Sequence, residues 1–361
     1  MAMKLVRGRT LPIGVDLGSR SVKMAQLRCM EETYELLAAA AVEVPDVPGA
    51  ATGPRPGMAD HVREALRSAP FKGAQCILAL PAEATFVHPV RLPKLPPAQI
   101  DAAIRAELAA KLPFPAAQAV IRHVIAGDVY GEGDPRQEVI AVAASRTTVE
   151  SYLAAARKAR LDVIGVNIEP CAIVECFSRL FRRASDQSRA ILFLDVGYTT
   201  TQVVLAHGSR IVFAKNLIFG DKDMDRAVAE GMSIPPEQAH GLRKDLRAET
   251  TAGSAVDEVY RLLAGSVDVL AAELMSCLRY YEAVFTNKPV ETAIFLGGGA
   301  GDKRFCQSVA QRLNLPAQIG DPLLRIERAE GAGLSIGLDR RDAQPAWAVA
   351  IGLRLGAATA A

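Results

Sequence analysis

Residues 16–23, "DLGSRSVK", combine a carboxylate, a glycine, two hydroxyls and a lysine inside one turn between two apolar runs. The side chains with chemical potential are Asp16, Gly18, Ser19, Ser21 and Lys23. Gly18 lets the backbone approach an anion closely, and the hydroxyl and N–H groups of the turn donate to it. Lys23 supplies the opposite charge, and Asp16 can hold a magnesium ion through its water. We therefore predict a phosphate-binding turn.

A second turn repeats this pattern in the later half of the chain. Residues 195–200, "DVGYTT", place Asp195, Gly197, Thr199 and Thr200 in the same order of carboxylate, glycine and hydroxyls. We expect the glycine and the hydroxyls to contact the same polyphosphate. Asp195, like Asp16, is expected to contact magnesium through water.

A third candidate is the glycine-rich stretch "FLGGGAG" at residues 295–301, which lies between an apolar run and a helical pattern. Gly297, Gly298 and Gly299 permit a flat or charged ligand to approach the backbone, and the helix that follows directs N–H groups toward it. Each segment alone is a weak signal. Together, in this order, they predict one nucleotide site assembled from separate parts of the chain.

The elements that must position these turns alternate between strands and helices, which predicts an α/β fold. "IGVDLGSRSVKMAQL" (13–27) and "LFLDVGYTTTQVVLA" (192–206) each predict strand, turn and strand, so the chain contains a long-period internal duplication. "DHVREALRSAP" (60–70) predicts a helix with Asp60 as its N-cap, and the closing "AVAIGLRL" (348–355) predicts a buried helix.

Composition narrows the class of protein. Of 361 residues, 50% are hydrophobic and 23% are charged, which is typical of a globular protein, and the net charge of +2 argues against a broad nucleic-acid surface. The six cysteines show no metal-binding spacing, which predicts reduced thiols. The sequence contains no apolar run long enough to span a membrane, so we expect a cytoplasmic protein.

The three turns resemble the phosphate-1, phosphate-2 and adenosine motifs of the actin/Hsp70/sugar-kinase ATPase superfamily. The resemblance implies ATP and Mg²⁺ as ligands. "NIEP" (167–170) resembles the segment that connects the two halves, which makes Glu169 the residue facing the nucleotide water and the one candidate catalytic group. In "EQAHGLRK" (237–244), His240 and Arg243 replace the acid and lysine that contact ribose and adenine in the family.

The resemblance extends over residues 12–355 to the type IV pilus assembly PilM family. It is carried by "KLPPAQIDAAIRAELAAKLPFP" (94–115), "FGDKDMDRAVAEGMSIPPEQAHGLRK" (219–244) and the closing "AVAIGLRL". It implies an actin-like fold, with ribonuclease H-like duplicated domains and a small inserted subdomain as in the division protein FtsA. The expected parts are residues 1–73 (first half of domain I), 74–165 (inserted α/β subdomain), 166–335 (domain II) and 336–361 (a C-terminal helix that returns to domain I).

The PilM resemblance also implies a function. It points to an ATP-binding scaffold, with weak or no ATPase activity, at the inner face of the inner membrane. Its expected partner is the N-terminal cytoplasmic peptide of a PilN-like membrane protein, entering as a strand or a short helix, with pilus motor proteins as further partners. A small-molecule kinase of the same superfamily and a type II secretion counterpart are the alternatives. In "FGDK" (219–222), Asp221 stands where a second glycine is common in the family, and a carboxylate there would repel a triphosphate.

Overall fold

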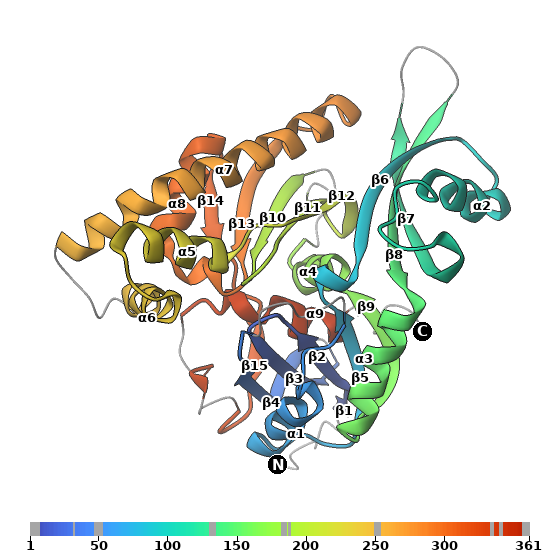
Figure 1. Cartoon of the computed structure of the whole chain (residues 1–361). Helices are drawn as coiled ribbons and strands as arrows, with labels where there is room; N and C mark the ends of the chain where they lie inside the picture. The colour runs from blue at the N-terminus through green and yellow to red at the C-terminus, as the bar shows by residue number, and fades with distance from the viewer. Residues whose placement is uncertain are drawn as a thin grey trace, which may run out of the picture.

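We describe a computed structural model that covers residues 8–31, 33–46, 53–129, 135–181, 186, 189–248, 254–332, 336–338 and 342–355. Within these residues the strands form three sheets. Two of them belong to large α/β lobes that lie one above the other, and the third forms a small lobe at their side (Figure 1). We call the lower lobe domain I, the upper lobe domain II and the small lobe the insert.

Domain I is built on a mixed sheet in the order β15-β4-β3-β2-β5-β9, with β1 paired to β3. Its strands are β1 (Arg9–Thr10), β2 (Ile13–Leu17), β3 (Ser21–Cys29), β4 (Tyr34–Glu43), β5 (Gln75–Leu80), β9 (Asp162–Ile168) and β15 (Ile326–Arg328). Helices α1 (Met58–Ser68) and α3 (Arg146–Lys158) cover one face, and α9 (Ala348–Leu355) covers the other. Because both faces are covered, the central strand β2 is buried along its length and is apolar apart from Asp16.

Domain II repeats the plan in the order β12-β11-β10-β13-β14. Its strands are β10 (Ala190–Val196), β11 (Thr201–His207), β12 (Arg210–Leu217), β13 (Val290–Leu296) and β14 (Ala317–Ile319). Its helices are α5 (Asp221–Met232), α6 (Pro236–Arg247), α7 (Ser254–Val284) and α8 (Lys303–Leu313). The predicted duplication is present, because β2-β3 and β10-β11 are equivalent antiparallel hairpins.

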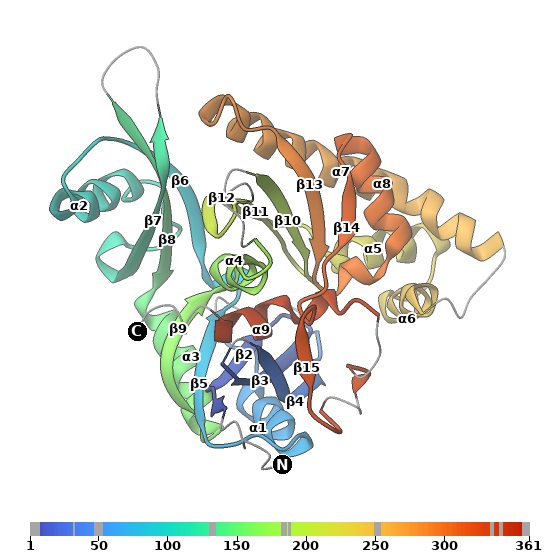
Figure 2. The ribbon, with the colours of Figure 1, turned by 180° about the vertical axis from the view of Figure 1, so that it is seen from behind.

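Two helices join the lobes at the centre of the molecule (Figure 2). Helix α4 (Glu169–Ser178) packs on β9 and also on β11 and β12, and α9 packs against α4. Their approach is close enough that a β-carbon at Gly352 would clash with the carbonyl oxygen of Ala172. The closing segment is therefore a buried helix, as the sequence predicted.

The insert is a three-stranded sheet in the order β6-β8-β7 with one helix. Its elements are β6 (Phe86–Pro93), α2 (Pro97–Leu108), β7 (Ala119–Val129) and β8 (Arg136–Ser145). Strands β5 and β9 pair with each other inside the sheet of domain I, so the separate sheet is narrower than the expected subdomain of residues 74–165. The division of the chain at residues 74, 166 and 336 stays a prediction.

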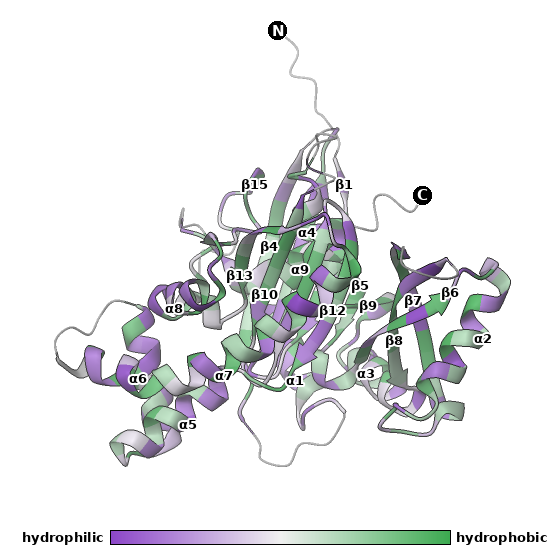
Figure 3. Ribbon diagram, turned by 90° about the horizontal axis from the view of Figure 1, so that it is seen from above, coloured by the Kyte–Doolittle hydropathy of each residue, from purple (hydrophilic) through white to green (hydrophobic). Residues whose placement is uncertain are grey.

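The insert has two apolar faces. On one face of its sheet, Val90 and Val139 pack with Ile104 of α2. The other face, with Val87 and Ile140, belongs to the same buried cluster as the core of domain II. Strand β12 packs against β6 and β7. Hydropathic colouring shows green residues on both the insert strands and the facing parts of α2 (Figure 3). The insert therefore packs against domain II through a shared hydrophobic core.

The expected N-cap at Asp60 is wrong. Helix α1 begins at Met58, and its N-cap is Gly57, whose φ of 76° is a left-handed conformation that glycine adopts without strain. Asp60 lies in the first turn, where its charge favours the helix dipole. In the part of the chain that is described, no helix combines the length and apolarity needed to span a membrane.

Candidate functional site

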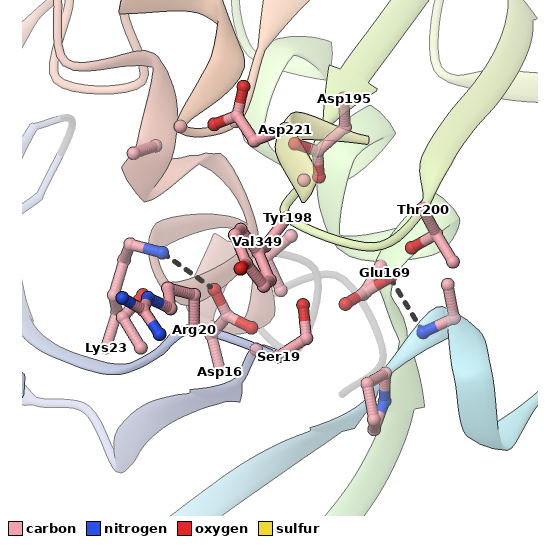
Figure 4. A pocket seen from close by; sticks show the side chains of 18 of the residues that line it. Asp16, Ser19, Arg20, Lys23, Glu169, Asp195, Tyr198, Thr200, Asp221 and Val349 are labelled. Carbon is pink, nitrogen blue, oxygen red and sulfur yellow. Dashed lines mark hydrogen bonds and ion pairs between the residues drawn. The ribbon is translucent and has the colours of Figure 1, made fainter. Parts of the chain in front are cut away.

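The three predicted turns meet at one cleft between domains I and II (Figure 4). Its volume of about 270 Å³ is at the lower end of the range for small-molecule sites. The predicted residues that line it are Asp16, Gly18, Ser19, Ser21, Lys23, Glu169, Asp195, Gly197, Thr200, His240, Gly297 and Gly298. Loops from two halves of the chain therefore converge on a single space.

The first turn carries a charge pair. Asp16 and Lys23 are cross-strand neighbours on β2 and β3, and their side chains lie 3.9 Å apart. Burial raises the pKa of the Asp16 carboxyl, and the Lys23 ammonium counteracts this rise. The tight bend favours glycine at position 18, since a β-carbon there would lie 3.0 Å from the Ser21 carbonyl oxygen and the turn would have to shift slightly.

The second turn has the same backbone and different electrostatics. Asp195 faces Gln202 in the register that places Asp16 opposite Lys23. The Gly197 N–H donates to the Thr200 carbonyl at 2.9 Å, and a β-carbon on Gly197 would lie 2.9 Å from the same oxygen. Burial, followed by the nearby Asp16 carboxylate, raises the pKa of Asp195 to about 7.

The glycine loop passes directly beside the second turn. Gly297 has a φ of 80°, and a β-carbon there would clash with the Asp195 carboxylate. Gly298 lines the cleft, and a β-carbon there would meet only the Asp221 carboxylate, at 4.0 Å. Gly299 instead packs against Val196, outside the cleft wall. Gly297 and Gly298 are therefore the members of this loop that a ligand can approach.

Glu169 lies at the start of α4, between the two turns. Its Oε2 accepts a hydrogen bond from the Ala82 N–H at 3.1 Å and another from the Gln202 amide. Burial, together with Asp16 and Asp195, raises the pKa of Glu169 well above its ordinary value. In Figure 4 the three carboxyl groups point into the same space.

These carboxyls fit a hydrated magnesium ion better than a directly bound one. The Asp16 carboxylate raises the pKa of Asp195, and both aspartates raise the pKa of Glu169, so a divalent cation between them would relieve this repulsion. Among the described residues, however, no group of three acidic, histidine or cysteine side chains is close enough to hold a metal directly. Mg²⁺ keeps several waters in nucleotide sites, which suits this spacing.

Three residues predicted to bind nucleotide do not line the cleft. Thr199 turns away and donates to Glu83, and Gly299 is packed on Val196 as noted. Arg243 is only 1% exposed. Its guanidinium donates to Asp221 at 3.0 Å and to Asp225 at 2.6 Å, so it acts inside the protein and is not free for a ligand.

This arginine cluster explains the unusual carboxylate at position 221. Asp221 lines the cleft, and it also accepts a hydrogen bond from Arg247 at 2.6 Å. With Arg243 and Arg247 beside it, the local charge is no longer negative, so the expected repulsion of a triphosphate is removed. Arg247 itself lines the cleft, as do Tyr198 and Lys244. No local sequence pattern indicates these three residues, because their partners lie far away in the chain.

A set of contacts crosses the mouth of the cleft. Asp46 of domain I accepts a hydrogen bond from the Tyr198 hydroxyl at 3.3 Å and pairs with Lys222 at 2.8 Å. Arg20 lies over the Tyr198 ring, 5.2 Å from its centre. His240 lines the cleft with its Nδ1 bonded to Asp225 at 2.8 Å. The contacts of Asp46 and Arg20 hold domains I and II together, whereas the His240–Asp225 bond lies within domain II.

A second cavity, which we call the groove, lies between domain I and the insert. It is lined by Leu80, Thr85, Val120, Arg122, His123, Val124, Val142, Ala144, Val149, Val166, Asn167, Ile168 and Cys171. Strand β9 is an edge of its sheet in the described part of the chain. It exposes Ile164 by 51% and Val166 by 42%, which is unusual for large apolar side chains on an edge.

Comparison with known proteins agrees with this architecture. A family model described as type IV pilus assembly protein PilM matches residues 14–357. A solved PilM-PilN type IV pilus biogenesis complex contains a chain with a TM-score of 0.77 and 22% identity, covering 96% of this chain and 98% of that one.

Two other solved structures share the fold. Ethanolamine utilization protein EutJ of Carboxydothermus hydrogenoformans has a TM-score of 0.57 at 15% identity, with 97% and 90% coverage. MreB5 of Spiroplasma citri, bound to AMPPNP, has a TM-score of 0.52 at 10% identity, with 98% and 97% coverage. The fold is actin-like, and the chain belongs to the type IV pilus assembly protein PilM family.

Proposed function

We propose that this protein binds ATP with Mg²⁺ in the cleft and acts as a cytoplasmic scaffold of the pilus machinery. The supporting observation is the convergence of both hairpin turns and the glycine loop on one space. Ser19, Lys23 and Thr200 would contact the phosphates, and Asp16 and Asp195 would hold the waters of the magnesium ion. His240 and Arg247, on α6, would face the nucleoside. When bound, the magnesium ion would supply positive charge that balances the buried carboxylates and the phosphates.

Two adjacent threonines provide a matched test of the nucleotide site. Thr200 lines the cleft, whereas Thr199 does not line it and donates its hydroxyl to Glu83 at the cleft wall. Isothermal titration with ATP and Mg²⁺ should show at least fivefold weaker binding for Thr200→Val, because one hydrogen bond to a charged group is worth about 1.5–3 kcal/mol. Thr199→Val should stay within about twofold of wild type. Equal effects of the two changes, or no binding by wild type, would contradict the proposed site.

We further propose that the groove captures an extended N-terminal segment of a PilN-like inner-membrane protein, through which the scaffold reaches the membrane. The edge of β9 offers unpaired N–H and C=O groups for an added strand. Ile164 and Val166 alternate along it and present apolar surface to every second residue of such a segment. The polar wall around Arg122 suits a partner that carries a carboxylate.

Two exposed valines make the matched test of the groove. Val166 belongs to it, and Val269 is exposed by 61% on α7, outside it. The probe is a fluorescein-labelled synthetic peptide of the N-terminal segment of a PilN-type protein from the same genome. Its anisotropy should report a loss of affinity of at least tenfold for Val166→Asp, because a charge would replace apolar surface that the bound peptide covers, and no change for Val269→Asp. Loss in both variants, or in neither, would place the partner elsewhere.

A further inference from the structure

The cleft and the groove are separated by a wall that two short segments form, and each segment lines both cavities. In the first segment, Leu80 and Thr85 line the groove, while residues 81–83 between them line the cleft. In the second segment, Ile168 lines the groove and Glu169, the next residue, lines the cleft. Ligands in the two cavities would thus touch neighbouring residues of the same segments.

A single side chain ties the two segments together. The Glu169 carboxylate accepts the N–H of Ala82, which is the first residue of the turn η1 (Ala82–Ala84), at 3.1 Å. The same oxygen accepts a hydrogen bond from Gln202 in the second hairpin. Glu169 therefore connects the turn that borders the groove to the hairpin that borders the cleft.

Domain II holds the turn from its other side. Asn216, on β12, donates to the carbonyl oxygens of Ala82 at 3.1 Å and Thr85 at 3.2 Å. The turn η1 follows β5 of domain I and leads into β6 of the insert. The turn η1 is accordingly connected to domain I, domain II and the insert. A displacement between domains I and II must therefore move the start of β6.

We propose that the hydrogen bond between the Ala82 N–H and the Glu169 carboxylate couples nucleotide binding in the cleft to the affinity of the groove for its peptide. This inference rests on the proposed function, because it needs both ligands. A ligand in the cleft fixes Glu169 and η1, so the groove is already ordered when the peptide arrives and less conformational entropy is lost. By linkage, the peptide strengthens nucleotide binding by the same factor.

The experiment measures one affinity in the presence and absence of the other ligand. Anisotropy of the labelled PilN-type peptide is titrated with the full-length chain, without nucleotide and with saturating AMPPNP and Mg²⁺. We expect the nucleotide to tighten peptide binding at least fivefold, which is the lower end of ordinary coupling. If both ligands bind and the peptide affinity changes less than twofold, the coupling is refuted. If either ligand fails to bind, the proposed function falls, and this coupling with it.

Ala82→Pro isolates the proposed bond. The change removes the N–H donor and adds the proline ring, which is suited to the first position of a helical turn, and Pro81 before it already has an extended ψ of 158°. The coupling factor is a ratio, so it remains interpretable if the variant weakens each ligand alone. It should fall below twofold in Ala82→Pro and in Glu169→Met, which removes the acceptor.

Two conservative changes complete the set. Glu169→Gln keeps an oxygen for the Ala82 N–H and should retain most of the coupling. Glu175→Gln alters a half-buried carboxyl on the same helix, outside both cavities, and should retain all of it. Full coupling in Ala82→Pro, or equal loss in Glu175→Gln, would overturn the assignment. Thermal unfolding of each variant identifies any that fails to fold.

Discussion

The two hairpins of the internal duplication share a backbone and differ in one cross-strand pair. In the first hairpin Asp16 faces Lys23, and in the second Asp195 faces Gln202. The Lys23 ammonium offsets part of the burial cost of Asp16, whereas Asp195 has no cation opposite it and its pKa rises to about 7. The comparison teaches that a duplicated turn can keep its shape while the buried carboxylate of one copy lacks the cation that pairs with it in the other.

The largest expected effect is a pH dependence that comes from the second hairpin. Because the folded pKa of Asp195 lies above the unfolded value of 3.8, its contribution to stability is full below that value and is lost as the pH rises through about 7. We expect the free energy of unfolding of the ligand-free protein to fall by about 2–4 kcal/mol between pH 4 and pH 8. Chemical denaturation of wild type and Asp195→Asn measures it, and the variant should show a flatter profile. Identical profiles would contradict the assignment.

Lys23→Met makes the first hairpin resemble the second. The change removes the cation beside the proposed phosphates, so ATP should bind with about 2–3 kcal/mol less free energy, a loss of 30- to 150-fold. Lys215→Met, which removes a lysine from a surface pair with Glu273, is the control and should leave the affinity unchanged. Titration calorimetry in the presence of Mg²⁺ decides, and an unaffected Lys23→Met would show that this turn does not contact phosphate.

Gln202→Lys makes the second hairpin resemble the first. A lysine at position 202 would lie opposite Asp195 and lower its pKa, so we expect the pH-dependent loss of stability to shrink by about 1–2 kcal/mol. Gln202→Met, of similar length and without charge, should not shrink it. If the two variants behave alike in denaturation across pH, the lysine at position 23 is not what separates the hairpins.

The smallest effect concerns what the hairpins have in common. A β-carbon at Gly18 or Gly197 would meet the carbonyl oxygen three residues later at 3.0 or 2.9 Å, so each alanine substitution should cost about 1 kcal/mol of stability. The two costs should agree closely when measured by denaturant unfolding. A large inequality would mean that the turns are not structural equivalents.

The hairpins and the closing helix were predictable because their signals are local. Asp16 and Lys23 share one turn, and the apolar residues of the closing helix are neighbours in the chain, so short segments suffice to place them. Arg243 was misjudged because the two aspartates that surround it, Asp221 and Asp225, come from another helix.

The remaining misses share a physical cause. Gln202 reaches Glu169 across the cleft, and the groove is formed where β9 meets the insert, so both depend on the packing of segments far apart in sequence. The sheet to which β5 belongs could not be read from the sequence for the same reason, because its parallel partners β2 and β9 are not its chain neighbours. Single-sequence patterns do not report which distant strands pair.

The insert's second apolar face has a consequence for anyone who dissects the molecule. Val87 and Ile140 help to build the core of domain II, and Tyr280 of α7 donates to the buried Glu138 of β8. Excising residues 86–145 would expose apolar surface along β12. It would also expose the apolar face of the removed fragment that packs against domain II. Such truncations should precipitate, and chimeras should exchange the insert and domain II as one block.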